Sequence, residues 1–160
     1  MKLLERLEDG FVIALFLGAL AALTAQLLSR YFLVYQFPWT EELARFLFTW
    51  FVFFGAANIM RRGDLIAVTL APDMLPDRPR AAIAIVMHLI GAVFFAVLVW
   101  TGVILVKKVA GLPTIAMGVS SSFEYAAVPA ASLIMCARSL RRAFDIWRNG
   151  LPRGEAATLI

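Results

Sequence analysis

The chain has 160 residues, of which 62% are hydrophobic, and its mean hydropathy is +0.83. Soluble domains of this size are usually only about 45–50% apolar, so the composition excludes an ordinary soluble domain and indicates a single integral membrane domain over residues 1–160. The net charge of +4 does not favour nucleic-acid binding, because basic residues that flank apolar runs are explained by their orientation in a membrane.

Residues 1–9 are predicted to form a short interfacial helix that ends at Gly10, because leucines lie on one side of it and charged residues on the other. The first membrane span is predicted at about residues 10–30. A cleaved signal peptide is the competing interpretation, which the three acids before the apolar run disfavour. Small residues spaced four apart let another helix approach this span closely: Ala14, Gly18 and Ala22.

The second span is predicted at about residues 39–61. Its first turns read Pro38-Trp39-Thr40-Glu41-Glu42-Leu43-Ala44-Arg45, with a proline and acids that favour a helix N-terminus, and it ends at Arg61 and Arg62. Gly55 offers a further site of close helix packing. Glu41 and Glu42 stand four and three residues before Arg45, so we expect either carboxylate to neutralise the guanidinium on one helical face.

A basic connection over residues 61–80 leads to the third span, predicted at about residues 81–106. The next apolar region is interrupted by glycines, a proline and three serines, so we expect a re-entrant or interfacial loop before a fourth span at about residues 122–140. A basic tail is predicted at residues 141–160. The predicted fold is therefore an all-α membrane protein with four transmembrane helices and a short N-terminal interfacial helix.

The distribution of basic residues predicts that both termini are cytoplasmic. With four spans, most of the 15 Lys and Arg fall on the side of the termini, and only four fall on the other: Arg30, Arg45, Lys107 and Lys108. Cytoplasmic loops carry such an excess of Lys and Arg. The polar start of the second span then faces outward.

No pattern of residues predicts catalysis, and neither a cofactor site nor a metal site is expected. Glu124 is a candidate proton or cation site, but the favoured interpretation places it at the interfacial start of the fourth span, where it complements the helix dipole. His88 is a candidate proton relay, although an isolated histidine on an alanine-lined face is more often hydrogen-bonded across a helix contact.

Charged and aromatic residues at the two ends of the second span form the group with the most functional information: Trp39, Glu41, Glu42, Arg45, Arg61 and Arg62. One interpretation is an aromatic belt with interfacial charges that neutralise one another. The other is a docking site for a neighbouring subunit, in which a spare carboxylate pairs with the partner. Membrane lipids are expected partners of the tryptophan and the arginine clusters.

These motifs, within a four-span chain of this length, resemble the small membrane subunit of tripartite ATP-independent periplasmic (TRAP) transporters. The resemblance extends over roughly residues 3–142. It is carried by Arg30-Tyr31, the motif Pro38–Arg45, Gly55-Ala56 and Arg61-Arg62-Gly63, with later support from Gly118, Tyr125 and Pro129. Family members often have a histidine where this chain has Leu65 and a proline near Ser120, so no role is carried over to those two positions.

The resemblance implies a subunit of the bacterial inner membrane that assembles with a large permease and a periplasmic solute-binding protein. Such systems import organic acids by sodium symport, and the small subunit extends the fixed scaffold of the large one. Two other classes stay open from the residues alone. They are a self-contained homo-oligomeric transporter or channel built around Glu124 or His88, and an anchor subunit of an unrelated membrane complex.

Overall fold

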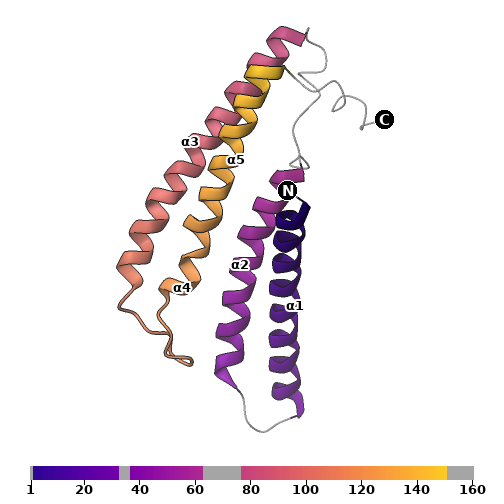
Figure 1. The fold of residues 1–160 in the computed structure, drawn as a ribbon. Coiled ribbons are helices and arrows are strands. Elements are labelled where there is room, and N and C mark those ends of the chain that lie inside the picture. The colour runs from indigo at the N-terminus through magenta and orange to yellow at the C-terminus, as the bar shows by residue number, and fades with distance from the viewer. Residues whose placement is uncertain (1, 33–36, 63–76, 151–160) are drawn as a thin grey trace.

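The computed structural model describes residues 2–32, 37–62 and 77–150, and within these ranges it consists of helices and a loop at residues 110–121 (Figure 1). The helices are α1 (Lys2–Phe32), α2 (Pro38–Arg62), α3 (Asp77–Val109), α4 (Ser122–Tyr125) and α5 (Ala127–Asn149). The all-α prediction is confirmed for these residues. Most of the predicted 61–80 connection and the last part of the tail lie outside them.

The predicted break at Gly10 is wrong, because α1 runs without interruption from Lys2 to Phe32. A glycine inside a helix costs only about 1 kcal/mol relative to alanine, and no other side chain or backbone atom comes within 4 Å of where a Cβ at Gly10 would lie. The helix therefore passes through the glycine. The residues predicted as a separate interfacial helix are instead the first turns of α1.

The last two long helices also extend beyond their predicted limits. α3 begins at Asp77, with Pro79 in its first turn, where the missing N–H of proline is tolerated. The fourth predicted helix is divided into the short α4 and the long α5, and α5 continues past Arg141 and Arg142 to Asn149. The first part of the predicted tail is thus helical.

Three helical segments are long and apolar enough to cross a membrane: Arg6–Tyr31, Pro38–Arg61 and Ala81–Val109. Among the described helices α5 does not meet the same criterion, since its C-terminal half carries several arginines. The chain is a multi-pass membrane protein by these segments. The fourth crossing, by α5, remains a prediction.

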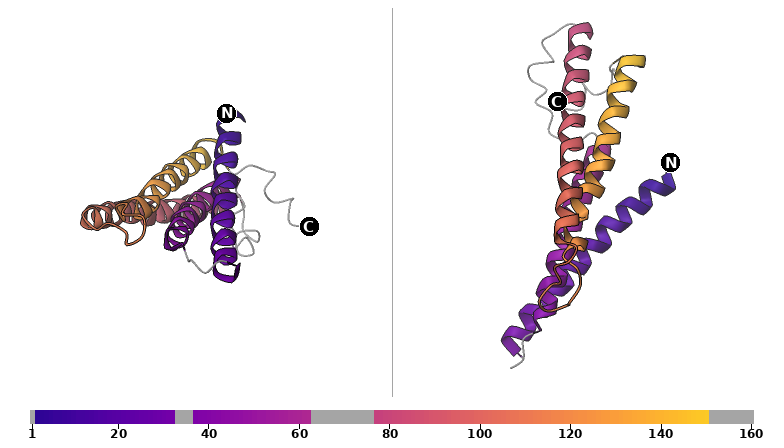
Figure 2. Two further views of the ribbon diagram at one scale, coloured as in Figure 1. Left: turned by 90° about the horizontal axis from the view of Figure 1, so that it is seen from below. Right: turned by 90° about the vertical axis from the view of Figure 1, so that its left-hand side faces the viewer.

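The long helices form two antiparallel hairpins that lie side by side (Figures 1 and 2). α1 packs along α2, α3 packs along α5, and α2 contacts α5, so the order across the bundle is α1, α2, α5, α3. The start of α1 and the end of α5 lie toward one end, the termini end. The 110–121 loop and the start of α2 lie toward the other, the loop end.

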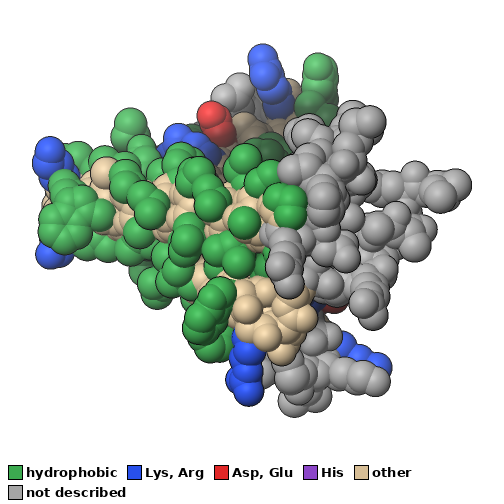
Figure 3. All heavy atoms as spheres, turned by 90° about the horizontal axis from the view of Figure 1, so that it is seen from above, with side chains coloured by type: hydrophobic (Ala, Val, Ile, Leu, Met, Phe, Trp, Pro, Cys, Tyr) green, Lys and Arg blue, Asp and Glu red, His purple; other side chains and the backbone are tan. Residues whose placement is uncertain are grey.

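Small residues make the contacts between the helices. Most of the buried apolar residues are alanines: Ala19, Ala22, Ala44, Ala57, Ala92, Ala127, Ala131 and Ala143. Among the described glycines, Gly102 of α3 has the closest neighbour, since a Cβ there would lie 3.0 Å from Cδ of Pro129. Large apolar side chains instead cover much of the described outer surface, with Lys and Arg near its edges (Figure 3). This distribution suits a lipid environment.

Candidate functional site

The first polar cluster lies at the loop end and is called here the loop-end cluster: Glu41, Glu42, Arg45 and Glu124. Nε of Arg45 lies 3.0 Å from Oε1 of Glu124, an ion pair that joins α2 to α4. The close ion pair of Arg45 is thus with a carboxylate of another helix, and the expected neutralisation by Glu41 or Glu42 of its own helix stays a prediction. Glu124 is only 13% exposed, and a carboxylate shielded in this way attracts the guanidinium more strongly than an exposed neighbour on the same helix.

Glu42 binds the backbone of the loop. Its Oε1 accepts a hydrogen bond of 2.9 Å from the backbone N–H of Ala116, and its Oε2 accepts one of 2.9 Å from Met117. Consecutive backbone N–H groups that point at one carboxylate form an anion-binding concavity. Glu42, one of the two candidates for a spare carboxylate, is thus used within this chain.

The loop itself is a small hairpin. Pro113 and Ser120 form an isolated antiparallel bridge, and the backbone N–H of Thr114 donates to the carbonyl of Val119 at 2.8 Å. Gly118 has a φ of 67°, which glycine adopts without the steric cost that a side chain would bring. The predicted re-entrant or interfacial loop is therefore ordered, and Glu42 holds its tip.

Glu41 connects α2 to α1 rather than to the loop. Its Oε2 accepts a hydrogen bond of 3.2 Å from Nε2 of Gln26. Trp39 is exposed and packs against Phe37, with ring centroids 6.5 Å apart. Three polar residues that are close in sequence, Glu41, Glu42 and Arg45, therefore contact three different elements. Glu41 and Arg45 are exposed, as is Trp39, whereas Glu42 is half-buried.

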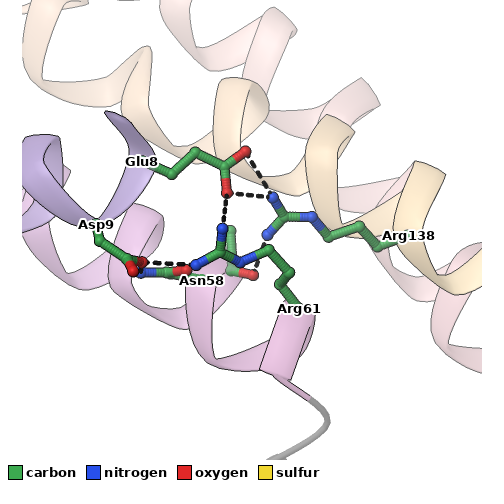
Figure 4. Close-up of polar contacts among 6 residues, drawn as sticks. Glu8, Asp9, Asn58, Arg61 and Arg138 are labelled. Carbon is green, nitrogen blue, oxygen red and sulfur yellow. Dashed lines mark hydrogen bonds and ion pairs between the residues drawn. The ribbon is translucent and has the colours of Figure 1, made fainter. Parts of the chain in front are cut away.

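The second polar cluster lies toward the termini end and is called here the termini-end cluster: Glu8, Asp9, Asn58, Arg61 and Arg138 (Figure 4). Nη2 of Arg138 donates to both carboxylate oxygens of Glu8, at 2.9 and 2.7 Å, and Nη1 donates to the backbone carbonyl of Ala57. These contacts join α5 to both helices of the first hairpin.

The rest of the termini-end cluster joins α1 to α2. Nη2 of Arg61 lies 2.6 Å from Oδ1 of Asp9, and Nδ2 of Asn58 donates to the same oxygen at 2.7 Å. Nη1 of Arg61 lies 3.6 Å from Oε2 of Glu8. Two arginines thus meet two acids, which offsets the high cost of charged groups in or near a membrane.

Sequence reasoning missed the termini-end cluster apart from Arg61. Glu8 and Asp9 were assigned to an interfacial helix, and Arg138 lay near the predicted end of the fourth span. The signal was present: acids and arginines flank the spans on the same predicted side, where they are able to pair. The side chain of Arg62, the other predicted docking residue at this end, lies outside the described part of the chain.

The predicted packing residues fall into two groups. Ala22 is buried, and Gly18 lies close to Leu47 of α2, since a Cβ there would be 3.2 Å from the leucine Cδ1. A Cβ on Gly55 would be 3.9 Å from Val12 of α1. Ala14, by contrast, is exposed. His88, the candidate proton relay, is half-buried on α3.

Both clusters act as joints between helices, and their chemistry is ion pairing and hydrogen bonding. Among the described residues, no group of three His, Cys, Asp or Glu side chains is placed to hold a metal ion. Arg45, Arg61 and Arg138 each bind a carboxylate of this same chain. The arrangement therefore connects the helices of this chain to one another.

Comparison with known proteins adds the family context. The family model described as "Tripartite ATP-independent periplasmic transporters, DctQ component" matches residues 19–149. The sialic acid TRAP transporter small permease protein SiaQ of Vibrio cholerae is 27% identical over 159 residues, which cover 99% of this chain and 92% of that protein.

Two longer permeases are also similar. The sialic acid TRAP transporter permease protein SiaT of Haemophilus influenzae is 25% identical over 142 residues, 88% of this chain but 23% of that protein. The isethionate TRAP transporter permease protein DctMQ of Oleidesulfovibrio alaskensis is 29% identical over 106 residues, 62% of this chain and 17% of that protein.

Proposed function

Because the chain belongs to the DctQ family of tripartite ATP-independent periplasmic transporter components, and is a small permease subunit of that kind, we propose that it forms the fixed scaffold beside a large permease. The transporter imports organic acids by sodium symport with a periplasmic solute-binding protein. It lies in the bacterial inner membrane, with both termini of this chain in the cytoplasm.

Two of the relatives support the association with a large permease. This chain matches 23% of SiaT and 17% of DctMQ, so a segment similar to it is one part of a much longer permease polypeptide in each. A segment that is covalently joined to a permease in some relatives is expected to bind the corresponding permease where the two are separate chains.

The observation that best supports the scaffold proposal is that three arginines bind carboxylates of this same chain. Carriage of an organic anion requires cationic groups or helix N-termini that are available to the substrate. Arg45, Arg61 and Arg138 instead bind Glu124, Asp9 and Glu8, and so connect helices of this chain. The proposal therefore assigns the substrate and sodium sites to the large permease.

The loop end is the proposed outward face, where a solute-binding protein would approach. Trp39 and Glu41 are exposed there, in the same first turns of α2 as Glu42, which holds the 110–121 hairpin. We assign docking to Trp39 and Glu41, and a positioning role to Glu42 and Arg45. Arg61 keeps its proposed role at the opposite, cytoplasmic face as part of the termini-end cluster.

Reconstitution tests the proposal. The chain, the permease that copurifies with it and the solute-binding protein would be placed in liposomes with an inward sodium gradient, and each component would be omitted in turn. We expect uptake of an organic acid only from the complete set. Sodium-driven uptake by this chain alone, or full uptake without it, would contradict the scaffold role.

The alternative of a homo-oligomeric transporter built around Glu124 receives less support from the geometry. The carboxylate of Glu124 already accepts from Arg45, so it is not available as a cation site unless that pair opens. The same liposomes distinguish the two proposals, because the alternative requires uptake by the chain alone that Glu124→Gln abolishes.

A further inference from the structure

A groove of about 250 Å³ lies between α1, α2 and α5, close to the termini-end cluster. Six apolar residues form most of its wall: Leu7, Phe11, Val12, Phe54, Ala57 and Ile134. Leu7 and Phe11 are largely exposed, so the groove opens on the outer surface of the bundle. Where this surface faces lipid and not the permease, an apolar groove suits an acyl chain.

The polar part of the groove wall is formed by Glu8, Asn58 and Arg138 (Figure 4). The groove therefore has an amphipathic wall, polar beside the termini-end cluster and apolar elsewhere. A phospholipid has the same division between head group and acyl chain.

The hydrogen bonds of this polar part show which head group it suits. Nδ2 of Asn58 donates to Asp9, which leaves its Oδ1 as an acceptor, and this buried oxygen receives no hydrogen bond from any residue that the structure describes. Glu8 is 42% exposed and its carboxylate retains lone pairs beyond those used by Arg138. Among the three residues of this polar wall, the buried atom without a hydrogen bond is thus an acceptor; outside the wall, the buried Nη1 of Arg61 is a donor without one, 3.6 Å from Glu8.

The guanidinium of Arg138 is used differently. It is only 19% exposed, and both of its terminal nitrogens already donate, to Glu8 and to the carbonyl of Ala57. An anionic head group would compete with Glu8 for this arginine. A head group with positive charge and N–H donors meets the free acceptors directly.

We propose that the groove between α1, α2 and α5 binds a phospholipid with a primary ammonium head group, of the phosphatidylethanolamine class. The ammonium lies at Glu8 and Asn58, and one acyl chain lies along Phe11, Phe54 and Ile134. The bound lipid completes the joint between the two hairpins.

The test compares three lipids with identical acyl chains. The full-length chain is delipidated in a mild detergent, mixed with equal amounts of phosphatidylethanolamine, phosphatidylcholine and phosphatidylglycerol, and analysed by native mass spectrometry. We expect one retained phosphatidylethanolamine, favoured at least about tenfold over phosphatidylcholine, whose quaternary ammonium has no N–H to donate. Equal retention of phosphatidylglycerol or phosphatidylcholine, or no retained lipid, would overturn the proposal.

A matched pair of variants locates the bound lipid. Ile134→Phe fills the groove, whereas Leu133→Phe adds a similar volume at a neighbouring position of α5 that is 61% exposed and is not part of the groove wall. We expect Ile134→Phe to lose the retained lipid and Leu133→Phe to keep it. Equal retention by both variants would place the lipid elsewhere and refute the site.

A third variant guards against misfolding as the cause of the loss. Asn58→Leu removes the free acceptor, together with the hydrogen bond that Nδ2 donates to Asp9, and leaves Glu8 and the apolar wall in place. We therefore expect the preference for phosphatidylethanolamine over phosphatidylcholine to weaken while the groove still retains a lipid. Thermal unfolding of each variant, without added lipid, shows whether it is folded. An unchanged preference in folded Asn58→Leu would contradict the assigned head-group contact.

Discussion

Arg45 links the two hairpins at the loop end through its ion pair with Glu124. Arg45→Ala and Glu124→Gln remove the same contact, so the double variant should lose less stability than the sum of the two single variants. Because Arg45 is 56% exposed, we expect a coupling of only about 0.2–1 kcal/mol. Thermal unfolding in detergent measures it.

The control for this cycle pairs Arg45→Ala with Glu41→Gln, whose carboxylate accepts from Gln26. The effects of these two changes on the free energy of unfolding should be additive, since they act on different contacts. Strong coupling of Arg45 to Glu41, with none to Glu124, would restore the pairing expected from the sequence.

Glu42 is expected to keep the hairpin tip closed. Glu42→Gln replaces one acceptor oxygen by an NH₂ group, so one of the two backbone N–H groups of Ala116 and Met117 loses its partner. A hydrogen bond to a charged group contributes about 1.5–3 kcal/mol, so protection of this loop against hydrogen exchange should fall by about tenfold or more. Exchange measured by mass spectrometry tests this, with Glu41→Gln as the variant that leaves the loop protected.

Among the elements, α3 and α5 meet in a close contact at Gly102. A Cβ at Gly102 would lie 3.0 Å from Cδ and 3.2 Å from Cβ of Pro129, so Gly102→Ala should destabilise the α3–α5 hairpin by about 1–3 kcal/mol. The matched control is Gly10→Ala in α1, which has open space and should stabilise its helix by about 0.5–1 kcal/mol. Opposite shifts in melting temperature are the expected result, and a stabilising Gly102→Ala would refute the close contact.

The helices were predictable from the sequence because long apolar runs are a local property. α2 begins and ends within a residue of the predicted span, since Pro38 and the arginine pair mark both ends. The predicted helix end at Gly10 was wrong because a single glycine is a weak helix-breaking signal. A glycine inside a helix costs about 1 kcal/mol, which continued hydrogen bonding and packing easily exceed.

The candidate site was predictable only as a set of residues and not as a set of contacts. Glu41, Glu42 and Arg45 were identified from their spacing, but their partners lie far away in the sequence: Gln26, the loop at Ala116 and Met117, and Glu124. Helical periodicity shows which residues share a face and does not show which other helix covers that face. The termini-end cluster was missed for the same reason.

At the scale of the whole molecule, the two hairpins meet through α2 and α5, and Arg138 joins them at the termini-end cluster. We expect fragments divided between α2 and α3 to reassociate when they are expressed together. Arg138→Gln should reduce their recovery as a complex by about tenfold, because it leaves Glu8 without its closest cation. Affinity purification through one tagged fragment measures the recovery.

The control for that experiment is Arg141→Gln, which changes an exposed arginine on the same helix. It should leave reassociation unchanged. If both substitutions reduced recovery equally, the effect would come from the net charge of α5, and the contact with Glu8 would not be its cause.

The termini-end cluster also has a consequence for biosynthesis. α1, which carries Glu8 and Asp9, is synthesised before α5, which carries Arg138. Until α5 is made, the contact of Glu8 with a cation that remains among the described residues is the more distant one with Arg61, at 3.6 Å. The first hairpin thus enters the membrane with an incompletely neutralised acid, and a prematurely terminated chain keeps that defect. Truncated copies of this subunit therefore carry an incompletely neutralised Glu8, which copies that contain α5 do not. We expect membrane proteases to distinguish the two by this difference.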